Sequence, residues 1–254
     1  MNKPLILVTN DDGIHSHGLW AAAAALLPLG EVLVVAPNQQ WSGAGRSMLG
    51  SFRAAATQFT REIAGKELIA YAVNAAPAAV VVHALLELAA RKPALVVSGI
   101  NLGANISTEV TISGTVGAAL EAAAAGIPAL AVSLALPIAL HNHATGAEVD
   151  YRAAQAFTRR FAQHLLSTPR PYDTHVLNLN IPQTATPEQC DNEESGPGYR
   201  VMAHPEQTAP DSDIYTLNVD KLISVTPLSL DLTARTSFGT LAADFHRTVL
   251  QPGT

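Results

Sequence analysis

Residues 4–13 read PLILVTNDDG. Its apolar run is typical of a buried strand, and the run ends on two adjacent carboxylates, Asp11 and Asp12. Like charges that close repel, so one of them holds its proton unless a cation neutralises the pair. Hard divalent cations take carboxylate oxygens as ligands, and Gly13 permits a sharp turn after the pair. The alternative is that an aspartate caps a following helix.

Composition bounds the class of protein. The chain has 254 residues, of which 48% are hydrophobic, so it can bury a sizeable core. Its formal net charge is −6 and it has no dense basic run, so we expect no nucleic-acid polymer as a partner. The single cysteine, Cys190, excludes an internal disulfide and fits a reducing compartment. No signal peptide or membrane-length apolar run is visible, and we therefore expect a cytoplasmic protein with no membrane partner.

Apolar runs alternate with alanine-rich helical segments through the first two thirds of the chain. The expected strands cover residues 4–9, 31–36, 93–98, 128–134 and 175–181, with a β-excursion over 48–59 and 67–73. The expected helices cover residues 19–29, 77–91, 114–126 and 149–166. Near-continuous aliphatic strands between helices predict an α/β fold with a mostly parallel sheet covered on both faces.

The pattern changes after Pro182. Residues 183–213 are rich in polar residues, Pro and Gly and predict a long loop or extended arm, with a last strand over 222–226 and a last helix over 239–250. This tail has too little apolar content for a core of its own. We therefore expect one domain over 1–254, with a core over about 1–182 and a C-terminal arm over about 183–254 that packs on the core or on another subunit.

Three polar, glycine-rich loops follow three of the strands, and in a parallel sheet they emerge at one edge, where ligands bind. The second loop contains Ser42 and the third contains Asn101 and Asn105. The third loop runs into residues 113–115, Ser-Gly-Thr, at a helix start, where backbone N–H groups and the helix dipole favour an anion. Each loop also has a local interpretation as a turn or a helix cap. Oxygen donors suit Mg²⁺ or Mn²⁺, and the absence of a Cys/His cluster argues against structural zinc.

Four motifs in this order resemble the SurE family of stationary-phase survival proteins, which are metal-dependent 5'(3')-nucleotidases. They are ILVTNDDG at 6–13, VAP at 35–37 followed by Ser42-Gly43, VSGIN at 97–101 followed by Gly103 and Asn105, and SGTVGAA at 113–119. Residues 223–228, ISVTPL, and 231–233, DLT, also look like the C-terminal strand of that family. The resemblance implies a Rossmann-like α/β domain whose C-terminal part exchanges with a neighbour, giving a homodimer or a homotetramer.

The same resemblance implies a site and a reaction. One divalent ion per subunit, Mg²⁺, Mn²⁺ or Co²⁺, is expected on Asp11, Asp12, Ser42 and Asn101, with Asp11 and Asp12 also catalytic. Phosphate or substrate is expected at Asn10, Gly43, Asn105, Ser113, Gly114 and Thr115. The implied reaction is hydrolysis of a nucleoside monophosphate to nucleoside and phosphate. The 5' phosphate is the expected target, and the 3' phosphate and polyphosphate stay open.

Departures from the family pattern support a second hypothesis. Residues 75–80 read AAPAAV where the family has a turn rich in hydroxyls and a carboxylate, Ile112 stands where Tyr is usual, and the region between Tyr199 and Ile223 looks shortened. The alternative function is a nucleotide- or metal-binding protein that has lost turnover. A covalent aspartyl-phosphate route is disfavoured, because such enzymes separate their two aspartates by one residue and here they are adjacent.

Several other side chains have two interpretations each. His15 and His17 either contact phosphate or face solvent, Trp41 either stacks on a base or anchors packing, and Arg46 pairs either with phosphate or in a surface salt bridge. We expect a surface loop at His141 and His143 and an interface at Tyr215.

Overall fold

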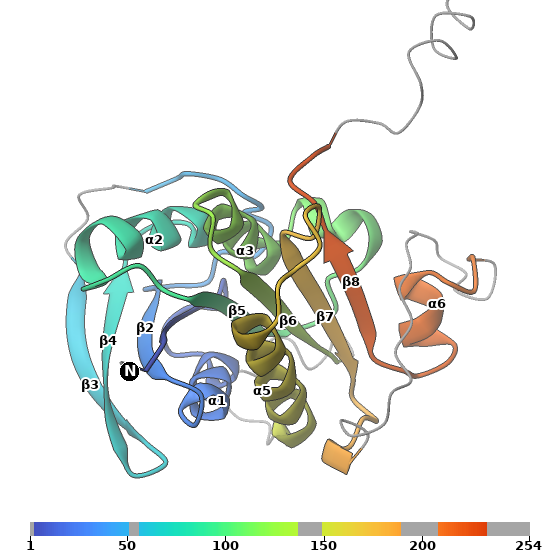
Figure 1. The fold of residues 1–254 in the computed structure, drawn as a ribbon, viewed down its shortest axis with the longest axis horizontal. Coiled ribbons are helices and arrows are strands. Elements are labelled where there is room, and N and C mark those ends of the chain that lie inside the picture. Colours follow the sequence, from blue (N-terminus) through green and yellow to red (C-terminus); the bar gives the residue numbers. More distant parts are fainter. Residues whose placement is uncertain (1–2, 51–55, 137–148, 189–207, 233–254) are drawn as a thin grey trace, which may run out of the picture.

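The computed structural model describes residues 3–50, 56–136, 149–188 and 208–232 (Figure 1). The strands are β1 (Leu5–Thr9), β2 (Glu31–Pro37), β3 (Thr57–Ile63), β4 (Lys66–Val73), β5 (Leu95–Leu102), β6 (Ala129–Ala135), β7 (Val176–Pro182) and β8 (Ser224–Leu228). The α-helices are α1 (His17–Leu26), α2 (Pro77–His83), α3 (Gly114–Ala124), α5 (Arg152–Ser167) and α6 (Asp213–Asn218). A π-helical segment, η1 (Ala84–Leu88), extends α2, and a 3₁₀ turn, η2 (Ser107–Thr111), precedes α3.

All eight strands form one sheet in the order β3-β4-β2-β1-β5-β6-β7-β8. The inner pairs are parallel, and only the two outermost pairs, β3 with β4 and β7 with β8, are antiparallel. This arrangement confirms the expected α/β fold with a mostly parallel sheet. It also places the ends of β1, β2 and β5 at one edge, because these three strands are neighbours and run in the same direction.

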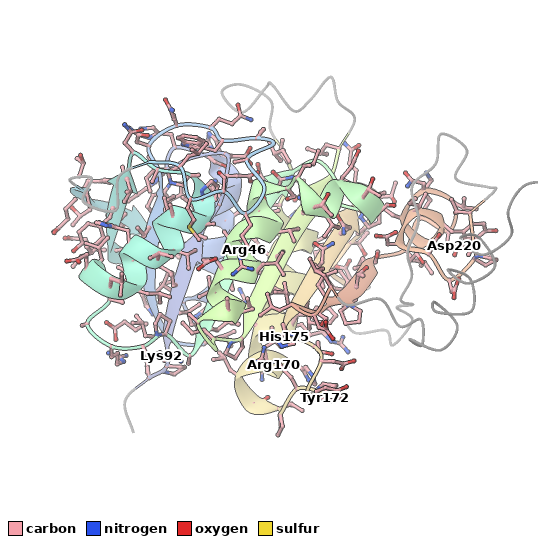
Figure 2. All side chains as sticks on the ribbon, turned by 90° about the horizontal axis from the view of Figure 1, so that it is seen from above. Arg46, Lys92, Arg170, Tyr172, His175 and Asp220 are labelled. Atoms are coloured by element: carbon pink, nitrogen blue, oxygen red, sulfur yellow. The ribbon has the colours of Figure 1, made fainter. Side chains whose placement is uncertain are left out.

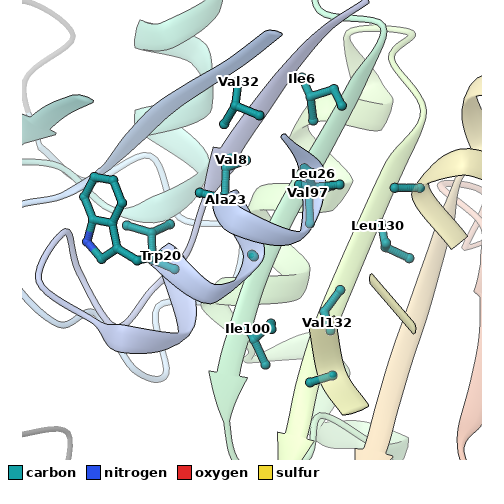
Figure 3. Close-up of a cluster of buried hydrophobic side chains, with 14 of the residues drawn as sticks. Ile6, Val8, Trp20, Ala23, Leu26, Val32, Val97, Ile100, Leu130 and Val132 are labelled. Carbon is teal, nitrogen blue, oxygen red and sulfur yellow. The ribbon is translucent and has the colours of Figure 1, made fainter. Parts of the chain in front are cut away.

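Helices cover both faces of the sheet. Helices α1 and α5 lie on one face, and α2 and α3 lie on the other (Figure 1). Figure 3 shows part of the core on the α1 and α5 face, where Val8, Val97, Leu130 and Leu26 of α1 belong to one cluster of fully buried side chains. Alternate residues of each strand point to opposite faces, so near-continuous aliphatic strands fill both cores at once.

Several features of the structure differ from the expected elements. The helix expected over 77–91 ends at Leu88, because burial fades along it and Leu86 is already exposed, so packing no longer supports further turns. Strand β5 continues past Ser98 to Leu102, since Ile100 and Leu102 pack inside the molecule. The expected loop over 99–113 therefore starts four residues late, and Asn101 lies on a strand.

The third difference is the short helix α6, for which residues 213–218 carry no clear periodic signal. Strand β8 follows it and pairs with β7 of the same chain, so this part of the tail joins the core sheet. The expected helix over 239–250, residues 51–55 of the excursion, His141, His143 and Cys190 lie outside the described residues. Within the described ranges, no helix has the length and apolar character needed to cross a membrane.

Candidate active site

The aspartate pair lies at the carboxyl end of β1, in the turn that leads to α1. Asp11 is 4% exposed and Asp12 is half-buried. The N-cap of α1 is Ser16, so neither aspartate caps that helix and the alternative interpretation of the pair does not hold. Asn10 closes the turn by itself: its side chain donates to the Gly13 carbonyl at 3.1 Å and accepts from the Gly13 amide at 3.2 Å.

Helix α3 meets Asp11 with its first turn. The Thr115 hydroxyl donates to Asp11 Oδ1 at 2.5 Å. A Cβ added to Gly114 would lie 2.7 Å from the Asp11 Cβ, so only glycine allows this approach. Burial raises the pKa of Asp11, while the Thr115 hydroxyl and the backbone amides of Thr115 and Gly114 act in the opposite direction. Ser113 is the N-cap of α3, and its hydroxyl accepts from the Val116 amide at 3.1 Å.

Asp12 has an unsatisfied oxygen. Its Oδ2 is buried and has no hydrogen-bond partner among the described residues. Burial, followed by the charge of Asp11, raises the pKa of Asp12 to about 7, and the Leu102 amide and the Gln40 side chain oppose this shift. A buried acceptor without a partner is uncommon in proteins and calls for a ligand, a water or an ion. Burial disfavours the ionised form of both carboxyl groups, and a bound cation would favour it. The pair is therefore a suitable place for a cation.

The second loop, residues 38–50, lies between the aspartates and α3. The Trp41 amide donates to the Asp11 carbonyl at 2.7 Å, and the Gly45 amide donates to the Ile112 carbonyl at 2.8 Å. Ser42 is exposed, and its hydroxyl accepts from Gln40 Nε2 at 3.0 Å. The predicted ligand Ser42 is thus linked to Asp12 through Gln40, which acts on both.

The third segment carries the two predicted asparagines in different surroundings. Asn101 is half-buried on β5, and its Nδ2 donates to the Gly103 carbonyl at 2.8 Å, which leaves Oδ1 without a partner among the described residues. Asn105 is 8% exposed, and its Nδ2 donates to Ser133 Oγ at 2.8 Å. The side-chain contact of Asn105 is therefore with β6, and its phosphate role stays a prediction.

The remaining candidates are placed as follows. His15 and His17 are both exposed. Arg46 pairs with Glu121 of α3 at 2.8 Å, which is the surface salt bridge of its two interpretations (Figure 2). Trp41 is half-buried, and its Nε1 is enclosed without a partner among the described residues. Tyr215 is half-buried on α6.

Two of the three departures from the family pattern, the turn at 75–80 and Ile112, lie in different settings. Ala75 and Ala76 are fully buried at the start of α2, where the Ala76 amide donates to the Leu49 carbonyl at 2.8 Å. Ile112 is 59% exposed beside Gly45. The backbone of the altered turn therefore bonds to the end of the second loop, at Leu49 and Gly50.

Sequence reasoning missed several polar residues near the site. Gln40 acts on both Asp12 and Ser42. Burial, and to a smaller extent the charge of Asp12, raises the pKa of Tyr151, which precedes α5, to about 12. Asn178 and Asn180 on β7 bond to the backbone of Asn105. The sequence feature that could have indicated Asn178 and Asn180 is their spacing, at alternate positions of an otherwise aliphatic strand.

Comparison with known proteins gives a consistent result. The family model described as Survival protein SurE matches residues 6–203. A 5'-nucleotidase SurE from Thermococcus gammatolerans is 38% identical over 273 residues, with 98% of each chain covered. A 5'-nucleotidase SurE from Methanocella arvoryzae is 39% identical over 255 residues, covering 90% of this chain and 93% of the relative. The crystal structure of the SurE protein from Aquifex aeolicus superposes with a TM-score of 0.71 at 27% identity, covering 96% of this chain and 99% of that one. On the extent of the family match and the identity to these relatives, the chain belongs to the SurE family.

Proposed function

We propose that the chain is a divalent-metal-dependent phosphomonoesterase that hydrolyses nucleoside monophosphates to nucleoside and phosphate, with the 5' phosphate as its target. The observation that carries the proposal is the pair formed by buried Asp11 and half-buried Asp12, in which Asp12 Oδ2 is enclosed and has no partner among the described residues. The relatives named 5'-nucleotidase SurE over nearly the whole chain supply the substrate class.

The donor set fits one hard cation. Asp11 and Asp12 offer carboxylate oxygens, and Ser42 offers a hydroxyl. Asn101 offers an amide oxygen that no other described residue bonds. Within the described ranges there is no group of three or more His, Cys, Asp or Glu side chains, so the neutral oxygens and water would complete the shell, as Mg²⁺ and Mn²⁺ allow. When bound, the ion supplies Lewis-acid polarisation of the phosphoryl group and a lowered pKa for water.

The protein groups around the ion have separate tasks. The Thr115 hydroxyl and the first amides of α3 fix the orientation of Asp11, so the carboxylate does not need to reorganise during the reaction. The same helix terminus offers partial positive charge toward the phosphate oxygens. Asp11 and Asp12 titrate as a coupled pair, so the role of orienting and deprotonating the attacking water belongs to the pair.

Phosphate release tests this function. The substrates are 5'- and 3'-nucleoside monophosphates and polyphosphate, each with EDTA, Mg²⁺, Mn²⁺ or Co²⁺. We expect cation-dependent release from the 5' esters, lowered about 10²–10³-fold in Asp11→Asn, the range found when one preorganised electrostatic group is removed. Asp150→Asn is the matched control, because Asp150 is exposed and pairs only with Arg152 among the described residues.

Two results would contradict the proposal. Turnover near the wild-type rate in Asp11→Asn would remove the aspartates from the site. Saturable nucleotide binding without phosphate release under any of the cations would favour the alternative of a binding protein that has lost turnover.

The assembly is part of the same proposal. We propose a homodimer, in which the C-terminal arm over 183–254 contributes to the contact, with a homotetramer as the larger alternative. Light scattering coupled to size-exclusion chromatography distinguishes these masses from a monomer of 26.6 kDa.

A further inference from the structure

The backbone of Asn105 is held by side chains of the neighbouring strand β7. The Asn105 amide donates to Asn180 Oδ1 at 2.7 Å. The Asn105 carbonyl accepts from Asn178 Nδ2 at 2.8 Å and from Asn180 Nδ2 at 3.1 Å. These bonds satisfy both polar groups of one residue in the middle of the loop that connects β5 to α3. We call Asn178 and Asn180 the asparagine clamp.

Within the described ranges, the clamp side chains bond to the loop backbone and not to their own strand. Both are fully buried, two positions apart on the face of β7 that carries Val176 and looks toward α3. A buried amide is costly unless it is hydrogen-bonded. Asn178 Oδ1 has no partner among the described residues. The side-chain amide of Asn178 therefore makes its hydrogen bond to the Asn105 carbonyl.

The clamp residue Asn180 lies in register, across β6, with the predicted metal ligand Asn101. Asn180 pairs in register with Ser133 of β6, and Ser133 pairs in register with Asn101 of β5. Ser133 also accepts from the side chain of Asn105 at 2.8 Å. The loop therefore leaves Asn101, is fixed at Asn105 against β6 and β7, and then returns to α3.

A second tether holds the same loop two residues later. The Ser107 amide donates to Asp213 Oδ2 at 2.9 Å, and Asp213 is fully buried at the start of α6. Ser107 has a φ of +56°, a left-handed conformation that a serine adopts only where its surroundings impose it. The loop is thus fixed at two successive points by segments from later in the chain.

We propose that Asn178 and Asn180 are positioning residues for the phosphoester hydrolysis: the clamp sets the first turn of α3 relative to Asn101. The inference rests on the proposed function for its catalytic consequence, and on the hydrogen bonds alone for its structural one. The clamp acts through Asn105 and the loop. Its loss misplaces groups that act on the reacting phosphate, and small misplacements lower the rate of the chemical step more than they weaken substrate binding.

Two variants and a matched control test the clamp. Asn180→Ala removes two of the three bonds, and Asn178→Ala removes one. Ser224→Ala is the control, because Ser224 is fully buried and pairs in register with Asn180. Among the described residues its hydroxyl hydrogen-bonds only with Thr226 Oγ1, at 3.3 Å. Hydrogen exchange of peptides covering residues 103–113 is measured in each variant, together with kcat and KM on a 5'-nucleoside monophosphate with Mn²⁺.

For Asn180→Ala we expect exchange over 103–113 to accelerate about tenfold and kcat to fall about tenfold, the effect of losing hydrogen bonds in a buried site, with KM nearly unchanged. Asn178→Ala shows smaller changes in the same direction, and it decides the question if Asn180→Ala does not fold. Wild-type exchange and kcat in the clamp variants, or equal losses in Ser224→Ala, would overturn the proposal. If the wild type itself releases no phosphate, the proposed function fails, and the exchange data alone decide whether the clamp exists.

Discussion

Asp12 carries a carboxylate oxygen that has no hydrogen-bond partner within the described part of the chain. Its Oδ2 is buried beside the nearly inaccessible carboxylate of Asp11, and both groups have raised pKa values because burial disfavours their charge. From the sequence, the adjacent aspartates predicted mutual repulsion relieved by a proton or a cation. Burial as the largest cause of the raised pKa values could be seen only in the structure. The sequence could not reveal Gln40 as the link to Ser42, because a glutamine in a polar loop has no distinctive spacing.

The raised pKa of Asp12 predicts how the cation-free protein responds to pH. An acid whose pKa is about 7 in the folded state and 3.8 when unfolded keeps its proton longer when folded. The folded state is therefore favoured below pH 4, and this stability is lost as pH rises through about 7. In EDTA we expect Tm to fall between pH 5 and pH 8.

The controls for the pH prediction lie in the same chain. Asp12→Asn removes the titrating group, so it flattens this part of the Tm profile. Asp150→Asn does not, because the Arg152 side chain lowers the pKa of Asp150 to about 2, outside the range measured. A wild-type Tm in EDTA that rises steadily from pH 5 to pH 8 would contradict the raised pKa.

At the scale of elements, helix α3 is the part that brings the loops together. Its first turn touches Asp11, and a Cβ on its Gly117 would lie 2.1 Å from the Gly45 carbonyl oxygen, so the helix also rests against the second loop. The helix was predictable from its alanines and its serine cap. The close approach of Gly114 to Asp11 could not be predicted, because a glycine in a helical segment does not indicate which distant residue it contacts. The continuation of β5 to Asn101 was also missed, since Gly99 resembled the end of the strand.

Gly114→Ala tests the close contact between the first turn of α3 and Asp11. In an exposed helix this change stabilises by up to about 1 kcal/mol. Here the new Cβ meets Asp11, so we expect lower Tm, weaker activation by Mn²⁺ and lower kcat. Ala124→Gly is the matched control, because it lowers the helix propensity of exposed Ala124 in α3 without reaching Asp11. A Gly114→Ala protein that is more stable and as active as wild type would show that α3 does not press on Asp11.

At the scale of the whole molecule, the central sheet brings together residues far apart in the sequence. The parallel order of β2, β1 and β5 could be predicted from aliphatic strands alternating with helices, and it delivers Asp12, Ser42 and Asn101 to one edge. The clamp could not be predicted from the sequence, because it depends on β7 lying beside β6 in the sheet, and the sequence does not give the order of these strands. Helix α6 was missed because six residues of mixed polarity have no usable period.

We expect cation binding at the proposed site, which is built from β1, β5, the second loop and α3, to stabilise the whole fold. An ion that binds the folded state alone at 100 times its Kd adds about 2.7 kcal/mol. We expect Mn²⁺ to raise the wild-type Tm at pH 7.5 and EDTA to reverse the rise. Asp11→Asn keeps little of the shift, while Asp150→Asn keeps all of it. Equal shifts in both variants would place the ion elsewhere.

The most direct measurement is anomalous diffraction from crystals of the protein grown or soaked with Mn²⁺. The account predicts one strong peak per chain between the carboxylates of Asp11 and Asp12, within ligand distance of the Asn101 amide oxygen or the Ser42 hydroxyl. A peak at another place in an ordered crystal, with the two aspartates free of metal, would contradict it.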